Sequence, residues 1–289
     1  MRATSVLNDL VGRVADRGRS MMGTTAPRTV AQLCDTLLTG KGEATGLAIA
    51  SAIFDRYDAM TPAARHDFFT MLRDRFSVDR ARTEAALQQW QDGDDTALRV
   101  LHAASEPRSQ ELIRRLNRAP GGTRRLVAMR NDLLNLMDDD ASLGALDADF
   151  RHLFSSWFNR GFLELQRIDW HTPANILEKI IKYEAVHEIS GWDDLRRRVA
   201  ALDRRLYAFF HPALGDDPLI FVEVALTADI PGDIGAILAA DRDMMPPAKA
   251  QTAVFYSISN CQTGLRGISF GNFLIKQVVE ELGREWPNL

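Results

Sequence analysis

The apolar positions in the first half of the chain recur every three or four residues, which is the spacing of amphipathic helices. Thr61-Pro62 offers a helix cap followed by proline at the first helical position, and Asp79 precedes the next helical run. Pro120-Gly121-Gly122 breaks the pattern, and we expect Thr123 to cap a helix through Met137. Helices are predicted over 29–38, 47–57, 62–76, 79–90 and 148–165. Residues 1–166 are thus predicted to form a helical bundle.

Three local features of this half need an interpretation. The aromatic residues of 148–165 are predicted to pack in the core: Phe150, Phe154, Trp157, Phe158 and Phe162. Asp138-Asp139-Asp140 is predicted to be a solvated loop, because three adjacent carboxylates cannot all face one cation. The Arg-rich N-terminus is interrupted by Asp9 and Asp16 and has a helical apolar face, so we expect a structural helix rather than a targeting segment.

After about residue 167 the pattern changes to helices alternating with β-rich stretches. Helices are predicted over 174–183, 192–202, 233–240 and 272–282, and strands over 206–211, 219–227 and 252–259. Arg196, Arg197 and Arg198 are predicted to be solvated, as arginine runs usually are. Glu223 lies within an apolar strand and is expected to point to a polar face or into an active cleft; both alternatives stay open.

Composition narrows the class of protein. An apolar content of 46% and a charged content of 26% are ordinary for a globular chain. The net charge of −4 argues against a general nucleic-acid binder, and no apolar run is long enough to span a bilayer. Cys34 and Cys261 form no disulfide or metal pattern, which favours a reducing, cytoplasmic location. The six histidines are scattered, and no metal-ligand cluster is visible.

The strand predicted over 252–259 leads into a glycine-rich turn and then a helix, an order that places backbone N–H groups at a helix N-terminus. Such a turn binds anionic phosphate without many basic side chains. Gln262 is placed to hold the strand end. The alternative is a turn that only joins strand to helix. The candidate binding residues are Arg266, Gly267, Ile268, Ser269, Phe270, Gly271 and Asn272.

Arg266, Ser269 and Gly271 fall on the first, fourth and sixth positions of the acyl-CoA pyrophosphate loop of GNAT acyltransferases, although Ser269 replaces the usual glycine. Three longer strings resemble the malonyl-CoA decarboxylase family, whose catalytic domain is GNAT-like. They are RIDWHTPANILEKIIKYEAVHEISGWDDLRRRV, FFHPALGDDPLIFVEVALT and SISNCQTGLRGISFGNFLIKQVVEEL.

The resemblance implies an α+β chain, with an N-terminal all-α helical bundle (1–166) followed by a partial GNAT-like mixed α/β domain (167–289). It implies decarboxylation of malonyl-CoA to acetyl-CoA and CO2 without a cofactor. The apolar faces of the helical domain are expected to serve self-association into homo-oligomers. Nucleic acid and membranes are not expected partners. The family's catalytic serine and histidine would lie beyond Leu289, so catalytic residues stay unassigned and we expect a fragment or a truncated product. Animal members carry an acidic residue at the position of Ser269.

Two alternatives remain open from the sequence. The chain could be a GNAT-like, acyl-CoA-dependent acyltransferase, which would need an acceptor site. It could also be a non-catalytic helical interaction protein that keeps the CoA loop.

Overall fold

The computed structural model describes residues 28–40, 42–93, 96–270, 273–287 and 289. The chain divides into two compact units, Met1–Ser156 and Trp157–Leu289. The helix predicted around Val6–Val14 lies outside the described residues. The observed split at 156/157 lies before the first strand of the second unit (Glu164–Ile168), whereas the expected split at 166/167 falls within that strand.

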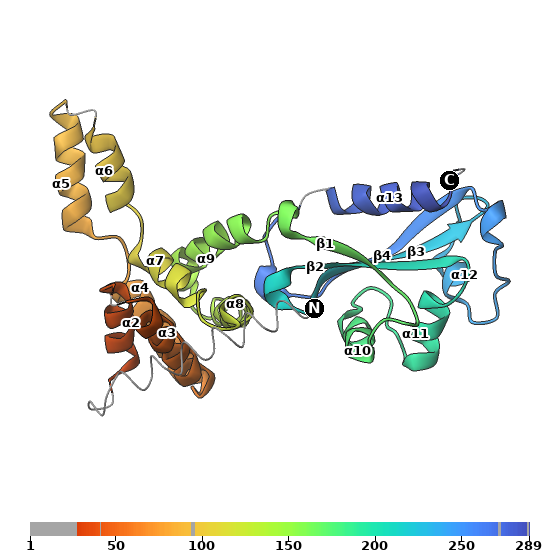
Figure 1. Ribbon diagram of the computed structural model, residues 1–289, viewed down its shortest axis with the longest axis horizontal. Helices are drawn as coiled ribbons and strands as arrows, with labels where there is room; N and C mark the ends of the chain where they lie inside the picture. The colour runs from red at the N-terminus through yellow and green to blue at the C-terminus, as the bar shows by residue number, and fades with distance from the viewer. Residues whose placement is uncertain (1–27, 41, 94–95, 271–272, 288) are drawn as a thin grey trace. The chain divides into compact units, whose positions relative to one another are not determined.

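The first unit is helical throughout its described part (Figure 1). The predicted starts are confirmed where a local cap defines them: Thr29 forms a capping box, Thr61 caps a helix that begins with Pro62, and Asp79 accepts from the Arg82 amide. The helices are α2 (Val30–Leu38), α3 (Glu43–Asp58), α4 (Pro62–Arg75), α5 (Arg80–Gln91), α6 (Ala97–Ala104), α7 (Arg108–Leu116), α8 (Gly122–Leu136) and α9 (Gly144–Trp157).

Buried aromatic and aliphatic side chains from α2, α3, α4, α7, α8 and α9 form the core of this unit. The rings of Tyr57, Phe68 and Phe69 meet edge to face, with centroids 5.2–5.8 Å apart. A buried ion pair crosses the same core, since Arg130 Nε donates to Asp147 Oδ1 at 2.8 Å. By contrast, α5 and α6 pack chiefly on each other.

Two predictions in this half are wrong. The helix predicted over 148–165 ends at Trp157, and β1 (Glu164–Ile168) follows after one 3₁₀ turn that leaves Phe162 exposed. Thr123 does not cap α8, which begins at Gly122. A Cβ at Gly122 would lie 2.6 Å from the Leu116 carbonyl oxygen, so only glycine fits where the helix starts.

The Asp138–Asp140 stretch divides into two kinds of environment. Asp138 and Asp139 are exposed, as predicted for a solvated loop. Asp140 instead caps the turn before α9 by accepting from the Ser142 amide, and it lies 3.1 Å from His66 Nε2. Its carboxylate therefore has a structural role.

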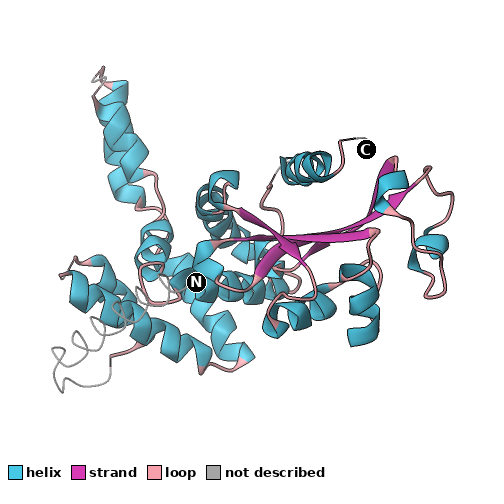
Figure 2. Ribbon diagram, turned by 45° about the vertical axis from the view of Figure 1, so that its right-hand side comes forward, coloured by secondary structure: helices cyan, strands magenta, loops and turns pink. Residues whose placement is uncertain are grey.

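The second unit is a four-stranded sheet in the order β1-β2-β3-β4, with all three pairings antiparallel. Figures 1 and 2 show α13 on one face of the sheet and α10 and α11 on the other. The remaining elements are α10 (Ala174–Tyr183), α11 (Trp192–Val199), β2 (Arg204–Phe210), β3 (Pro218–Thr227), α12 (Ile234–Leu238), β4 (Thr252–Asn260) and α13 (Phe273–Glu285).

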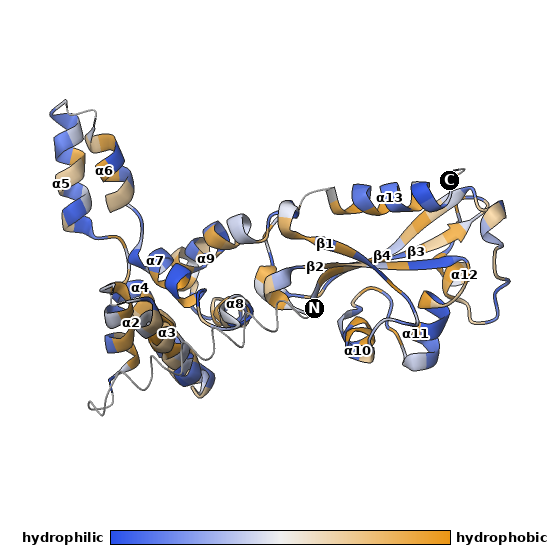
Figure 3. Ribbon diagram, in the orientation of Figure 1, coloured by the Kyte–Doolittle hydropathy of each residue, from blue (hydrophilic) through white to orange (hydrophobic). Residues whose placement is uncertain are grey.

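Strand alternation gives the sheet two apolar faces. Leu206, Ala208, Phe210 and Phe221 form one buried cluster with side chains from α10 and α11. Residues such as Tyr207 alternate to the opposite face, along which α13 lies with its apolar side inward (Figure 3). A sheet covered on both faces explains why β2 and β3 are almost continuously apolar.

A long connection, residues 228–251, joins β3 to β4 and contains only α12 and one 3₁₀ turn. It is held to the start of β2 by Asp203, whose carboxylate accepts from the Arg242 guanidinium and from the Met245 amide. Arg204 adds a bond to the Ile237 carbonyl oxygen. The stretch around Ile230 is exposed.

Candidate functional site

The end of β4 is fixed firmly to β3, and this fixes where the candidate loop begins. The Cys261 amide donates to the Leu219 carbonyl oxygen at 2.8 Å, and Gln262 Nε2 donates to the Pro218 carbonyl oxygen at 3.0 Å. The prediction that Gln262 holds the strand end is thus confirmed. Cys261 is also part of the buried cluster on the α10–α11 face.

The candidate loop turns back through a 3₁₀ turn, Thr263–Leu265, and then a glycine. The Arg266 amide donates to the Thr263 carbonyl oxygen and the Ile268 amide to that of Leu265, at 2.9 and 3.0 Å. Gly267 has φ of +78°, a conformation that glycine adopts without strain. Ile268 is buried, so it anchors the turn in the protein.

Arg266, Gly267 and Ser269 are exposed, and Phe270 is half-buried. Gly271 and Asn272 lie outside the described residues, and α13 begins at Phe273. The structure therefore places five of the seven candidate residues on one tight turn between β4 and α13.

The amides of Arg266 and Ile268 are already hydrogen-bonded within the turn. An anion at this loop would consequently use other amides, the Arg266 guanidinium and the positive end of the α13 dipole.

A second group of polar residues, whose pairing the sequence did not reveal, lies on the α10–α11 side of the sheet. Glu223 of β3 is fully buried, and its Oε2 accepts from Arg198 Nη1 at 3.1 Å. Asp194, one helical turn before Arg198, accepts from the same guanidinium at 3.2 Å. The prediction that all three arginines of α11 are solvated is therefore wrong for Arg198, which is buried, whereas Arg196 and Arg197 are exposed.

Burial raises the pKa of the Glu223 carboxyl from its ordinary 4.5 to about 7, against the opposing effect of the Arg198 guanidinium. Glu223 thus lies on a buried face rather than a solvent-exposed polar one. Two sequence signals could have found the pair: the i, i+4 spacing of Asp194 and Arg198, and a lone carboxylate within an apolar strand.

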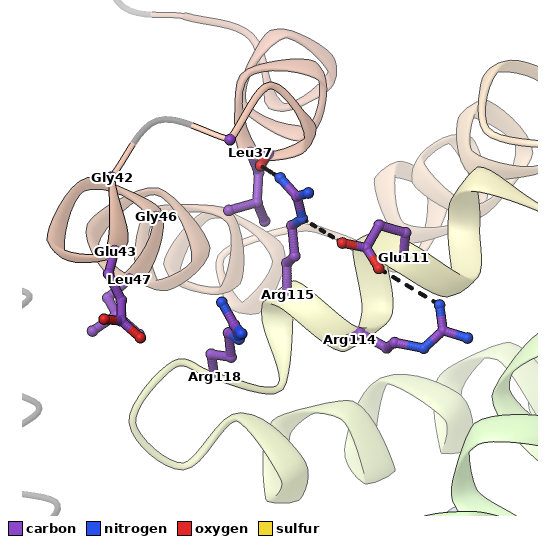
Figure 4. Close-up of a pocket in the computed structure, with 10 residues that line it drawn as sticks. Leu37, Gly42, Glu43, Gly46, Leu47, Glu111, Arg114, Arg115 and Arg118 are labelled. Atoms are coloured by element: carbon purple, nitrogen blue, oxygen red, sulfur yellow. Dashed lines mark hydrogen bonds and ion pairs between the residues drawn. The ribbon is translucent and has the colours of Figure 1, made fainter.

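The helical unit also has a pocket of about 410 Å³ between α2, α3 and α7. Figure 4 shows Arg115 directed at Glu111 and at the Leu37 carbonyl oxygen, and Arg114 directed at Glu111. These two guanidiniums are neutralised by the protein's own groups. The pocket is therefore a weaker anion site than its arginine content suggests, and it contains none of the candidate residues.

The described residues offer neither a metal-binding cluster nor a membrane-spanning helix. They contain no group of three or more His, Cys, Asp or Glu side chains arranged to hold a metal ion. Among the helices that the structure describes, none has both the length and the hydrophobicity needed to cross a bilayer.

Both units match models of one protein family. The malonyl-CoA decarboxylase N-terminal domain matches residues 76–158, and the malonyl-CoA decarboxylase C-terminal domain matches residues 161–289. The chain belongs to the malonyl-CoA decarboxylase family.

Solved structures of the family share the fold described above. The crystal structure of malonyl-CoA decarboxylase from Agrobacterium vitis is 59% identical with a TM-score of 0.86, covering 90% of this chain and 63% of that one. The structure from Rhodopseudomonas palustris is 54% identical with a TM-score of 0.86, covering 91% and 65%. The α+β class with a helical N-terminal region, predicted from the sequence, is confirmed.

Curated relatives in the family are more distant and much longer. The mitochondrial malonyl-CoA decarboxylase of Rattus norvegicus is 36% identical over 253 residues, which are 81% of this chain and 50% of the relative. The enzyme of Anser anser anser is 38% identical over 73% of this chain and 42% of its own length. The chain spans about half the length of the curated relatives it matches.

Proposed function

We propose that this chain binds malonyl-CoA and takes part in its decarboxylation to acetyl-CoA and CO2. Membership of the decarboxylase family carries the proposal. The exposed turn between β4 and α13 supports it, since it offers a glycine of positive φ, a guanidinium and a helix N-terminus where the CoA phosphates would bind.

In this proposal the turn has a positioning role. Gly267 lets the backbone come close to the pyrophosphate, Arg266 and Asn272 flank it, and Ile268 anchors the turn. Ser269, Phe270 and Gly271 complete the binding segment. Binding energy at the phosphates would then be available to hold the thioester in place for carbon–carbon bond cleavage.

The chemistry requires stabilisation of negative charge on the thioester oxygen as CO2 leaves, followed by protonation of the enolate carbon. A carboxylate that is poorly solvated departs more readily, so the site must exclude water around it. Neither step needs a metal or organic cofactor, and we propose that none is used. We assign no residue of this chain to the proton transfer.

We also propose that the protein is cytoplasmic and self-associates through the helical unit. The exposed Trp90 and Leu98 on α5 and α6 support self-association, because large apolar side chains at the surface favour contact with another protein. The two buried free cysteines are compatible with a reducing compartment.

The first experiment measures CoA binding by calorimetry for the wild type and for Gly267→Val. The variant should weaken binding at least about tenfold, because a β-branched residue is strained at positive φ and crowds the phosphate. Gly283→Ala, in α13 where no atom lies within 4 Å of an added Cβ, is the matched control and should bind normally. Failure of the wild type to bind CoA would overturn the proposal.

The second experiment follows acetyl-CoA by mass spectrometry after incubation with malonyl-CoA. Acetyl-CoA in excess over protein, lost in Gly267→Val and kept in Gly283→Ala, would show that this chain alone catalyses the reaction. If CoA binds and no acetyl-CoA forms, the proposed catalytic participation of the isolated chain is refuted while its binding role stands.

A further inference from the structure

Arg198 joins β3 to the segment that follows α10. Its Nη1 donates to the His187 carbonyl oxygen at 2.8 Å and to Glu223 at 3.1 Å, and its Nη2 donates to the Glu188 carbonyl oxygen at 2.9 Å. A single buried guanidinium thus holds residues 184–190 against the sheet.

The same segment is joined to β4 by a second carboxylate. Glu184 accepts from Ser257 Oγ at 2.8 Å and from Ser259 Oγ at 3.0 Å. It also accepts from the amides of Val186 and His187. A continuous series of polar contacts therefore runs from Glu223, through Arg198 and residues 184–190, to the last part of β4.

Glu223 lies opposite an irregularity in β4. Glu223 pairs with Ser257 and Val224 with Phe255, so Tyr256 is the extra residue of a β-bulge. Bulges weaken the ladder locally, and side-chain contacts then have more influence on the position of the strand. Tyr256 lies about four residues, or roughly 13 Å, before the end of β4, where the candidate CoA loop begins.

The buried surroundings of Glu223 make the strength of its contact with Arg198 depend on whether the carboxyl is ionised. Its Oε1 has no hydrogen-bond partner within the described part of the chain. The charged and titratable groups near it are Arg198 of α11, Arg204 of β2, Glu184 after α10 and Tyr256 of β4. In a low-dielectric interior an ionised Glu223 attracts Arg198 strongly, whereas a neutral carboxyl retains only a hydrogen bond.

We propose that Glu223 is a positioning residue whose ionisation tightens the hold of Arg198 on residues 184–190 and thereby sets the end of β4 for acyl-CoA binding. This inference rests on the proposed function of the loop. The contacts above provide the route, and the raised pKa of Glu223 places the change in ionisation near neutral pH. CoA affinity should therefore include a contribution that rises with pH.

The test compares CoA binding by calorimetry at about pH 6 and pH 8 for the wild type, Glu223→Gln and the exposed control Glu178→Gln. The phosphates of CoA titrate in the same way with all three proteins, so the ratio of wild-type to variant affinity at each pH isolates the protein's contribution. For Glu223→Gln this ratio should rise about fivefold between the two pH values. For Glu178→Gln it should stay constant. A constant ratio for Glu223→Gln would overturn the inference.

Two further measurements separate positioning from simple damage to the fold. Ser259→Ala removes one contact to Glu184 and the acceptor of the Ala185 amide but leaves Glu223 intact, and it should reduce the same pH-dependent difference. The second measurement is hydrogen exchange, corrected for intrinsic rates, of the Ala185, Val186 and His187 amides. At about pH 8 these amides should be better protected against exchange in the wild type than in Glu223→Gln, and at about pH 6 they should be equally protected in both proteins. Equal protection at both pH values would contradict the inference even if CoA binds. Absence of CoA binding by the wild type would instead overturn the proposed function.

Discussion

Replacing Glu223 by glutamine should change how the stability of the protein depends on pH. Burial raises the pKa of this carboxyl in the folded protein from 4.5 to about 7, so the folded state holds a proton that the unfolded state has already released. Between these values the free energy of unfolding falls as pH rises, because the folded state binds more protons. The stabilisation from Glu223 is fully present below about pH 4.5 and is lost by about pH 7.

The size of the effect follows from the difference between the two pKa values. At about 1.4 kcal/mol for each pKa unit, a rise from 4.5 to about 7 corresponds to at most about 3.5 kcal/mol. Glutamine has nearly the same shape and cannot ionise. The free energy of unfolding of Glu223→Gln, relative to the wild type, should therefore increase by about 2–3 kcal/mol between about pH 5 and pH 8.

The assay is urea denaturation of both proteins at several pH values, followed by intrinsic fluorescence. Glu178→Gln removes a carboxylate from the surface of α10 and controls for the loss of one charge. A relative stability that does not change with pH would refute the reasoning. A wild type that gains stability over the variant as pH rises would show that Arg198 more than offsets the cost of burial, and that the folded pKa is depressed.

Three other predictions concern separate parts of the chain. Asp147→Ala should lower the free energy of unfolding by about 3–5 kcal/mol in urea denaturation, because it removes the carboxylate that forms a buried ion pair with Arg130. Asp139→Ala, at an exposed position, should lower it little. Gly267→Ala should lower stability by about 1–2 kcal/mol through strain at positive φ, whereas Gly283→Ala should raise it; equal effects would contradict the φ argument. Burial raises the pKa of the Cys34 thiol to about 12 and also raises that of the Cys261 thiol. Both thiols should therefore resist iodoacetamide at about pH 8 until the protein unfolds, as mass spectrometry would show.

Features that depend on neighbours in sequence were predictable. Thr61-Pro62 and Asp79 define helix starts because the cap bonds reach only three residues along the chain. The end of α9 was not predictable in this way. Phe158 and Phe162 continue the helical spacing, yet Phe158 is buried against the ring of His211, 4.8 Å away between centroids. A contact with a residue that follows β2, far along the chain, overrides the local pattern there.

The candidate site likewise contains one feature that is set by neighbouring residues and one that is set by contacts between distant parts of the chain. The turn at Gly267 is encoded locally, since only glycine suits its backbone angle, and the sequence located it. The Arg198–Glu223 pair joins residues far apart in the chain, and arginine runs are usually solvated. Its existence depends on the register of β2 with β3 and on the placement of α11, which no local pattern specifies. The binding role of the loop itself stays a prediction.

The connection between β3 and β4 has a consequence for how the protein tolerates change. Its contacts with Asp203 and Arg204 involve Ile237, Arg242 and Met245, all beyond the exposed stretch around Ile230. A peptide inserted at Ile230 would extend into solvent without disturbing those contacts or the pairing of the strands. This point is therefore suited to carry an epitope or a fluorescent label, and it is where we expect a protease to make its first cut in the second unit.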